Sequence, residues 1–257
     1  MRLKDRIAIV TGADSGIGQG IAEAFAQEGA DIAFCYRRDA DGAAETVRRI
    51  EAAGRRALSL QADLRDPAAI AMLFERTAAE LGTPDILVNN AGIGSNEAPI
   101  AEASLEEWED VLRTDLTAPF LCCQHFVRQR QAAGGRGRII NITSVHEAIP
   151  SPKNLSYGAA KGGLLTFTRS LALELAAQRI NVNAIAPGLI HTPMTAERVE
   201  DPAQMAEQLP NIPWRRPGRP WEVGRLAAYL ASDDADYITG QSFTIDGGLE
   251  MNWGQGA

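Results

Sequence analysis

Three residues in the second half of the chain have side chains suited to moving a proton to or from an alcohol. Tyr157 and Lys161 lie four positions apart in the segment SYGAAK, so a helix places them on one face. Ser144 closes the β-branched run IINITS. Reversible hydride transfer at a carbinol carbon requires that the alcohol lose its hydroxyl proton as the hydride leaves, and that a carbonyl oxygen regain one in reverse. The three residue types therefore predict an alcohol dehydrogenase or ketone reductase.

The expected role of each residue follows from its acidity. A free phenol titrates near pH 10, so proton exchange near pH 7 requires about 4 kcal/mol of preferential stabilisation of the phenolate. An ammonium about 4 Å away, at an effective dielectric of about 20, supplies energy of that order. We expect Tyr157 to be the general acid/base, assisted by Lys161, and Ser144 to hold and polarise the substrate oxygen. A tyrosine and lysine with this spacing are also common as a surface pair, so a second motif must support the interpretation.

That second motif is the glycine-rich segment TGADSGIG at residues 11–18, between a predicted strand and a predicted helix. Its glycines let the backbone turn tightly and approach a pyrophosphate, and the following helix offers free N–H groups. Glycine spacing alone also fits a structural turn, but the strand and helix around it favour a nucleotide site. The expected cofactor-binding residues of this loop are Gly12, Asp14, Ser15, Gly16, Ile17 and Gly18.

The end of the second predicted strand bears on the choice of dinucleotide. Tyr36 is followed there by Arg37 and Arg38. An acidic residue would accept the ribose hydroxyls of NAD, whereas arginine suits the additional phosphate of NADP and contributes roughly 1.5–3 kcal/mol. The like charge of Asp14, at about 8 Å, would cost about 2 kcal/mol per unit charge. We expect NADP(H) to be favoured and NAD(H) to be usable; the alternative for the two arginines is a solvated basic turn.

Strands and helices that alternate along the chain would position these residues. Short β-branched runs lie at 7–10, 32–35, 57–60, 86–88, 138–142, 180–185 and 242–245, and helical patterns lie at 21–28, 43–52, 68–81, 105–131, 156–177 and 221–230. Parallel strands need crossover connections, so the order predicts an α/β fold with a doubly wound, Rossmann-type parallel sheet and helices on both faces. We expect residues 1–257 to form one domain, with an irregular, lid-like insertion at about 192–220.

Composition excludes several classes of partner. The net charge of -8 gives no broad positive surface, so no nucleic acid is expected. No run approaches the roughly 18 apolar residues of a membrane span, and the first residues lack a signal-peptide pattern, so we expect a cytoplasmic protein without a membrane partner. Cys35, Cys122 and Cys123 do not suggest a disulfide framework. The three histidines, His125, His146 and His191, lack metal-ligand spacing, so no metal is expected.

With these motifs in place, the chain resembles the short-chain dehydrogenase/reductase family over essentially its full length. The matching residues are 11–18, Asp63 with Leu64, Asn89 to Gly92, Ser144, Tyr157 with Lys161, and Pro187 to Thr192. The resemblance implies that Asp63 and Leu64 flank the adenine and that Ile190 and Thr192 hold the nicotinamide carboxamide. It also places Asn90, Ala91, Gly92, Pro187, Gly188, Tyr157 and Lys161 along the cofactor. The alternative for Asn89 and Asn90 is an ordinary turn after a strand, which asparagine and glycine favour in any protein.

Within this family the chain looks most similar to bacterial glucose 1-dehydrogenases, through the segments SVHE at 144–147, APGLIHTP at 186–193, Asp201-Pro202 and DGG at 246–248. The resemblance implies an alcohol, ketone, sugar or polyol substrate. The residues then expected to contact it are His146, Glu147, Asn96, Glu97 and Asn154. Substrate-facing loops are where members of one fold diverge.

One position departs from the family pattern. Many members have asparagine in the long fourth helix, supporting a water chain to the lysine, whereas this chain has Asp115. If the backbone carbonyl at 115 holds the water, the aspartate is tolerated; if the side chain matters, its carboxylate compensates Lys161 and opposes ionisation of Tyr157. We include Asp115 among the catalytic candidates and expect an active enzyme with a basic shift in its pH profile.

Two other functions stay open at this point. The enzyme alternative is a reductase of carrier-bound 3-oxoacyl groups, for which Arg215, Arg216, Arg219 and Arg225 offer a basic patch. The alternative from another class is a nucleotide-sensing protein without catalysis. Family resemblance further implies a homo-oligomer, expected to be a tetramer formed through the long helical patterns at 105–131 and 156–177.

Overall fold

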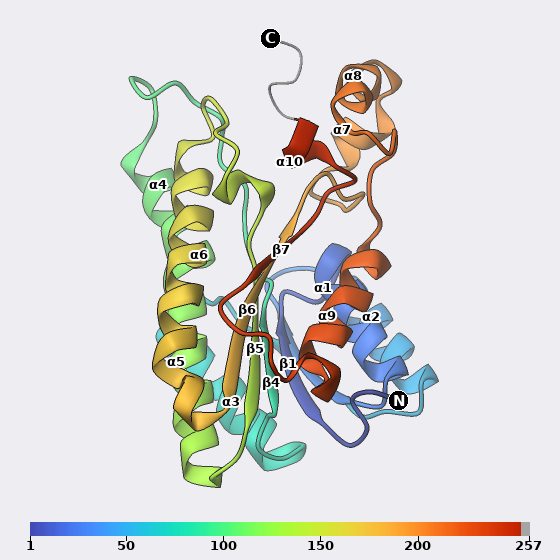
Figure 1. The fold of residues 1–257 in the computed structure, drawn as a ribbon, viewed down its shortest axis with the longest axis vertical. Helices are drawn as coiled ribbons and strands as arrows, with labels where there is room; N and C mark the ends of the chain where they lie inside the picture. Colours follow the sequence, from blue (N-terminus) through green and yellow to red (C-terminus); the bar gives the residue numbers. More distant parts are fainter. Residues whose placement is uncertain (253–257) are drawn as a thin grey trace.

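Seven parallel strands form the centre of the computed structural model, which describes residues 1–252 (Figure 1). Their order across the sheet is β3-β2-β1-β4-β5-β6-β7. The strands are β1 (Ile7–Thr11), β2 (Asp31–Tyr36), β3 (Ala57–Gln61), β4 (Ile86–Asn89), β5 (Gly137–Ile142), β6 (Ile180–Pro187) and β7 (Ser242–Ile245). The central strands are buried along their whole length because helices cover both faces. The predicted doubly wound α/β fold is confirmed, and every predicted strand is present.

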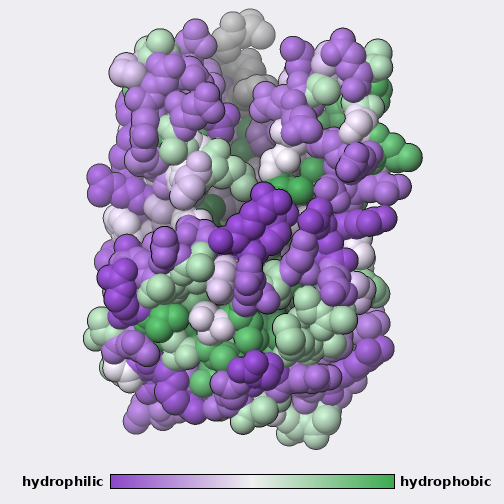
Figure 2. Space-filling view, turned by 180° about the vertical axis from the view of Figure 1, so that it is seen from behind, coloured by the Kyte–Doolittle hydropathy of each residue, from purple (hydrophilic) through white to green (hydrophobic). Residues whose placement is uncertain are grey.

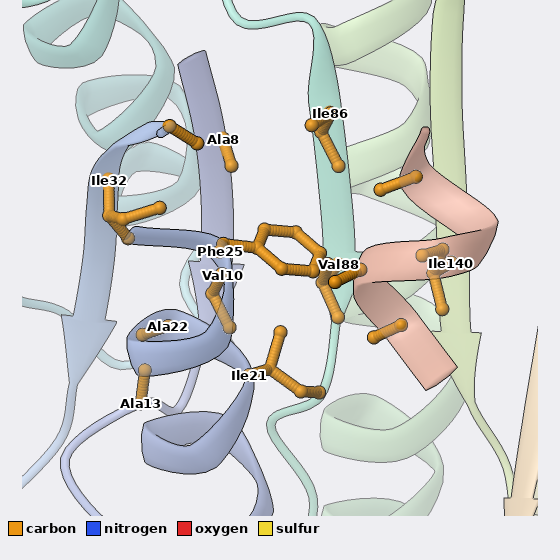
Figure 3. Packing of buried hydrophobic residues seen from close by; sticks show 14 of the residues in the cluster. Ala8, Val10, Ala13, Ile21, Ala22, Phe25, Ile32, Ile86, Val88 and Ile140 are labelled. Atoms are coloured by element: carbon orange, nitrogen blue, oxygen red, sulfur yellow. The ribbon is translucent and has the colours of Figure 1, made fainter. Parts of the chain in front are cut away.

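Helices α1 (Gly16–Gln27), α2 (Ala40–Ala52) and α9 (Pro220–Ala231) cover one face of the sheet. Phe25 of α1 lies at the centre of this layer, fully buried beside Val10, Ile21, Val88 and Ile140 (Figure 3). Helices α3 (Pro67–Glu80), α5 (Ala118–Ala133) and α6 (Leu155–Leu175) cover the other face, and α4 (Leu105–Leu112) packs against α6.

Helices α1 and α9 approach each other unusually closely. The contact is made by Gly20, Gly224 and Pro220: a Cβ added at Gly20 would lie 2.7 Å from the carbonyl oxygen of Pro220, and one at Gly224 would collide with the carbonyl oxygen of Gly20. Small residues at these positions let the two backbones touch. The contact fixes the start of α9 beside the first helix.

Strand order reverses between β1 and β4, which are neighbours in the sheet although two strands separate them in sequence. From β1 the chain adds strands outward to β3 at one edge of the sheet, and from β4 it adds strands outward to β7 at the other edge. In open parallel sheets, ligands bind outside the carboxyl ends of the strands at such a switch point. The segments that follow Thr11 and Asn89 therefore frame the expected site.

Two regions differ from the sequence prediction. The helical pattern at 105–131 contains a π-turn, Arg113–Thr117, between α4 and α5. The insertion at 192–220 was expected to be irregular, but it contains the short helices α7 (Ala196–Glu200) and α8 (Pro202–Gln208), because Asp201 caps α8 at its start. A final short helix, α10 (Leu249–Asn252), ends the described chain.

Seen from behind, the surface is mostly hydrophilic, with hydrophobic patches concentrated in the lower half of the view (Figure 2). No helix among residues 1–252 is both long and apolar enough to cross a membrane.

Candidate active site

The glycine loop after β1 leaves backbone groups open at the start of α1. Gly12 and Gly16 have φ values of 62° and 54°, which favour glycine. A Cβ at Gly12 would lie 2.9 Å from Cα of Ala91, and one at Gly16 would lie 3.1 Å from Cβ of Thr192. Ser15 occupies the N-cap position without a side-chain capping bond, and the first turn carries no acidic residue. The first N–H groups of α1 thus face a space that side chains do not fill.

Asn90 holds this loop against the end of β4. Its amide nitrogen Nδ2 donates to the carbonyl oxygens of Thr11 (2.9 Å) and Gly12 (2.8 Å). The hydroxyl of Thr11 accepts from the backbone N–H groups of Asn90 (2.9 Å) and Ala91 (3.0 Å). A side chain at Gly18 would collide with both Gly12 and Asn90. The structure therefore brings residues 12–18 and 90–92 together, and adds Thr11, whose role the sequence did not indicate.

A groove of about 690 Å³ begins at this loop. Ser15, Gly16, Thr192 and Pro193 line its inner end, and it continues along α1 as far as Gln27. Ile190 is buried and pairs with Gly218 in an isolated parallel bridge, which anchors the segment that carries Thr192. An open helix N-terminus, glycines in place of side chains and a threonine across the loop suit a diphosphate-containing dinucleotide. The residues present therefore fit a dinucleotide cofactor.

The expected adenine end of the site is rich in charge. Arg65 donates to the carboxylates of Asp63 (2.6 Å) and Asp110 (2.9 Å). The hydrogen bonds from Arg65 lower the pKa of Asp63 to about 2, against the opposing effect of burial. Burial raises the pKa of Asp14, and the nearby Arg37 opposes this. Arg65 is a further member of this cluster that the sequence interpretation missed, because its partner Asp110 is distant in sequence.

The remaining adenosine-side residues lie where β2 and β3 end. Tyr36 and Arg37 are half-buried and Arg38 is exposed, while the carbonyl of Arg37 accepts from Nε2 of Gln61 (3.0 Å). Leu64 is buried. No ion pair engages the guanidinium of Arg37 within residues 1–252. Its donors are therefore not engaged by a carboxylate of the described chain.

Ser144, Tyr157 and Lys161 converge at the carboxyl end of β5. Lys161 is 4% exposed, and its Nζ donates to the carbonyl of Ile142 (3.1 Å). The same Nζ lies 5.3 Å from the centre of the Tyr157 ring. Ser144 caps a short 3₁₀ turn, and its Oγ accepts from the N–H of His146 (3.2 Å). The ring of His146 meets that of Tyr157 edge to face, with centroids 6.1 Å apart.

A chain of buried amides and hydroxyls ties the elements of this cluster together. Asn89 at the end of β4 donates to Asn141 of β5 (2.8 Å), and Asn141 donates to the hydroxyl of Thr168 in α6 (2.8 Å). At the start of α6, the hydroxyl of Ser156 donates to Glu107 of α4 (2.7 Å). None of Asn141, Thr168 and Glu107 was singled out from sequence; a polar residue amid an apolar strand was the available signal for Asn141.

Asp115 enters the site through the π-turn. The N–H of Ala118 bonds to the carbonyl of Arg113, five residues earlier, which widens the helix at this point. Asp115 is fully buried; its Oδ2 lies 3.1 Å from Nζ of Lys161, and its Oδ1 accepts from the N–H of Ile93 (2.9 Å). Burial raises the pKa of Asp115, against the opposing pull of Lys161.

The residues expected to contact the substrate are not all gathered around Tyr157. His146 lies beside Tyr157, and Asn154, three residues before Tyr157, accepts a hydrogen bond from Ser95. Asn96 and Glu97 are exposed in the loop after β4, where Glu97 has a left-handed φ of 51°. Glu147 turns toward the start of β7, where its Oε1 accepts from Ser242 (2.6 Å). His146 thus meets the tyrosine ring directly, and Asn154 lies at the N-cap of α6, the helix that carries Tyr157.

Pro187 ends β6, and a Cβ at the adjacent Gly188 would lie 2.6 Å from Cβ of Asp246. Glycine is therefore required for the chain to leave the sheet beside the loop after β7. The described residues contain no group of three or more His, Cys, Asp or Glu side chains placed to hold a metal ion.

Comparison with known proteins agrees with this arrangement. Residues 12–250 match the family model described as enoyl-(acyl carrier protein) reductase. The chain is 41% identical to 3beta-hydroxysteroid dehydrogenase 1 of Eggerthella lenta over 262 aligned positions, covering 99% of this chain and 98% of that protein. It is 38% identical to glucose 1-dehydrogenase 2 of Bacillus subtilis over 249 positions, which cover 97% of this chain and 96% of that protein.

Solved structures show the same fold. Acetoin dehydrogenase from Enterobacter cloacae matches with a TM-score of 0.88 at 41% identity and covers 98% of each chain. A provisionally assigned 2-deoxy-D-gluconate 3-dehydrogenase from Agrobacterium tumefaciens, solved with bound NADP, matches with a TM-score of 0.86 at 38% identity, covering 96% of this chain and 97% of that one. The chain therefore belongs to the short-chain dehydrogenase/reductase family of oxidoreductases, as the sequence motifs predicted.

Proposed function

We propose that this protein is an NAD(P)-dependent dehydrogenase or reductase of secondary alcohols and ketones, sugars and polyols included, in which Tyr157 is the general acid/base. The observation that carries the proposal is the position of the buried Lys161, whose Nζ lies 5.3 Å from the centre of the Tyr157 ring, at the strand end where Ser144 also lies. A phenol, an ammonium and a hydroxyl meet there beside a loop that fits a dinucleotide.

Each side chain of the cluster has its own role in the proposed reaction. Ser144 and the phenol oxygen of Tyr157 hold the substrate oxygen, which orients the carbinol carbon toward the cofactor. The bound dinucleotide supplies or accepts the hydride. In oxidation, ionised Tyr157 takes the hydroxyl proton of the alcohol as the C–H bond breaks; in reduction, the phenol returns that proton to the new alkoxide oxygen. Lys161 stabilises the phenolate electrostatically, and its bond to Ile142 fixes the ammonium in place.

For the cofactor we propose a preference for NADP(H), with NAD(H) also accepted. Arg37 at the end of β2 supports this, and the NADP-bound relative is compatible with it. Asp14 and Asp63 interact electrostatically with Arg37. Their negative charges oppose binding of the additional phosphate of NADP, which limits the preference for NADP(H) over NAD(H). Arg37→Ser should weaken NADPH binding about tenfold or more and leave NADH binding within a factor of about three. Intrinsic fluorescence quenching measures both affinities, and equal losses for the two cofactors would contradict the assignment.

Substrates of the relatives differ in size and polarity, from a hydroxysteroid to acetoin and glucose by their names. We propose a small polar alcohol or ketone, because the imidazole of His146 lies beside Tyr157 and the polar residue Asn154 begins the helix that carries it. Glu147, Asn96 and Glu97 remain proposed contacts of a longer polyol. His146→Leu should raise the KM for sugars and polyols at least tenfold and change the KM for a small monofunctional ketone little; the opposite ranking would exclude the polar-substrate proposal.

The family model's description keeps a carrier-bound acyl substrate as the second candidate. Arg216 forms two hydrogen bonds with Glu222, and Arg225 stacks on Trp221 at 4.5 Å, so two of the four arginines have side-chain partners. Arg215 donates to the backbone carbonyl of Leu209 (3.3 Å). The double variant Arg215→Glu, Arg219→Glu separates the two candidate substrates. A selective loss of activity toward a carrier-bound 3-oxoacyl group would favour that substrate. Unchanged activity would exclude the basic patch as a docking site for an acidic carrier.

The decisive experiment is a panel of ketones, alcohols and sugars assayed with NADPH, NADH and their oxidised forms. The proposal expects turnover that Tyr157→Phe lowers at least a thousandfold, while cofactor affinity changes little. Ser144→Ala should lower turnover at least a hundredfold. Cofactor binding without turnover in the whole panel would support a nucleotide-sensing protein. Equal activity of parent and Tyr157→Phe would exclude the tyrosine as acid/base.

We also propose a cytoplasmic homotetramer that buries exposed apolar side chains on α5 and α6, such as Phe120 (46% exposed) and Leu173 (83% exposed). Light scattering of the purified protein measures the assembly. The mass of a single chain at micromolar concentration would contradict it.

A further inference from the structure

The buried ammonium of Lys161 has a carboxylate as its direct neighbour. Asp115 approaches it from the π-turn with 3.1 Å between Oδ2 and Nζ, and neither side chain has appreciable contact with solvent. Oδ1 is held by the N–H of Ile93, in the loop that follows β4. A Cβ at Gly92 would lie 2.7 Å from Oδ2, so this loop closes over the carboxylate. The ion pair therefore has little freedom to separate.

Each element packed around Lys161 contributes to its electrostatic surroundings. Asp115 comes from the π-turn, Glu147 from the 3₁₀ turn after β5, Tyr157 from α6 itself, and the carbonyl of Ile142 from β5. The ring of His146 stands beside Tyr157. Asp115 is thus the carboxylate in direct contact with the ammonium, and Glu147, which is bonded to Ser242, adds a weaker influence from farther away. An ammonium that carboxylates neutralise attracts a phenolate less strongly than an isolated one, because the fields of the opposite charges nearly cancel at the phenol.

The charge state of the lysine supports this arrangement. Burial opposes its ionisation, but Asp115, followed by Tyr157, outweighs burial and raises the pKa of Lys161 above its ordinary value. The lysine consequently stays an ammonium through neutral and mildly basic pH. Its pull on the phenolate is then set by its carboxylate neighbours, since its own charge does not change in that range.

We propose, on the basis of the proposed function, that Asp115 is a positioning residue that holds Lys161 and partly cancels its charge, so that Tyr157 ionises, and alcohol oxidation sets in, at a more basic pH than the lysine alone would give. The carboxylate exchanges no atom with substrate or cofactor. It acts through the lysine, and the same hydrogen-bonding set ties the loop after β4 to α6.

Asp115→Asn tests the proposal because it removes the charge and keeps an oxygen for the N–H of Ile93. The first readout needs no cofactor: tyrosinate absorbance at 295 nm is titrated in the free protein, and the same titration of the matching Tyr157→Phe protein is subtracted. One charge at about 8 Å and an effective dielectric of about 20 corresponds to a shift of roughly 1 to 1.5 pH units. The midpoint of the Tyr157 titration should fall by this amount in Asp115→Asn.

The second readout is the pH profile of kcat/KM for alcohol oxidation, whose acidic limb should move by the same amount and in the same direction. Glu109→Gln is the matched control, because it removes an exposed carboxylate of α4 that pairs with Arg113. That control should move neither the titration nor the profile. A lower turnover with an unmoved midpoint would assign Asp115 a purely structural role and overturn the proposal.

Asp115→Ser provides a second uncharged variant with an acceptor for Ile93 if the amide does not fold. Its midpoint should fall as well, and a midpoint that stays at the wild-type position would overturn the proposal. The two proposals fail separately. If the midpoint shifts but the protein turns over no substrate, the role of Asp115 is supported and the proposed function is rejected. If catalysis is normal but the midpoint does not move, the proposed function is supported and the role of Asp115 is rejected.

Discussion

The side-chain amide of Asn141 donates a 2.8 Å hydrogen bond to the hydroxyl of Thr168, which joins β5 to α6 beneath the catalytic cluster. Ser144 lies three residues beyond Asn141, and Lys161 lies two turns before Thr168 on its helix. A bond between two other residues, both of them fully buried, therefore helps to set the spacing of the serine and the lysine.

Removing the acceptor of this bond should cost stability. In Thr168→Val, the buried amide of Asn141 loses its partner while the volume of the side chain is kept, so the free energy of unfolding should fall by about 1–3 kcal/mol. Urea denaturation measures the change. Thr166→Val, two residues earlier on an exposed part of the helix, is the control and should stay within about 0.5 kcal/mol of the parent. Equal effects of the two substitutions would mean that the buried bond contributes nothing.

Helices α1 and α9 should not tolerate a methyl group between them. Gly224→Ala places its Cβ against the backbone carbonyl of Gly20, which cannot move without shifting α1, so we expect a loss of about 2–4 kcal/mol. Gly162→Ala in α6 has open space around its Cβ and should be neutral or stabilising by up to about 1 kcal/mol. Thermal unfolding of both variants checks the prediction, which fails if Gly224→Ala melts with the parent.

Stability should depend on pH through Asp31. Burial disfavours its carboxylate, but hydrogen bonds from the backbone and side chain of Arg56, together with the charge of Arg55, outweigh burial and lower the pKa of Asp31. A carboxyl group whose folded-state pKa is depressed stabilises the protein above its unfolded value of about 3.8, and this contribution is lost as the pH falls through the folded-state value.

Asp31→Asn should therefore lower the free energy of unfolding by about 2 kcal/mol at pH 7, and the difference from the parent should shrink below about pH 4. Urea denaturation at a series of pH values measures this difference. Asp234→Asn, which removes an exposed partner of Arg2, should have little effect at any pH. A gap between Asp31→Asn and the parent that stays constant down to pH 3 would contradict the linkage.

The cysteines should be inert in the folded protein. Burial raises the pKa of Cys35 and of Cys123 to about 12, and it raises the pKa of Cys122 as well. The thiolate is the reactive form, so modification by a thiol-reactive disulfide reagent should proceed only as fast as the chain opens. Denaturation should then release all three thiols. A thiol that reacts within seconds in the native state would contradict the burial.

The sheet, the glycine loop and the Ser144, Tyr157 and Lys161 cluster could be predicted because each has a local signature: β-branched runs, glycines between a strand and a helix, and four-residue spacing. Contacts between distant segments had no such signature. The π-turn at 113–117 could not be separated from a continuous helix, since its short sequence RTDLT carries no signature of its own. The Arg65 bridge to Asp110 and the turning of Glu147 toward Ser242 are consequences of tertiary packing.

The contact of Pro220 with Gly20 also limits how the segment between β6 and α9 can behave. That segment leaves the sheet beside the glycine loop and returns to the first helix only a short way from the same loop, so both of its ends are tethered on the nucleotide side. The middle of the segment, around α7 and α8, is therefore the part that these two contacts restrain least.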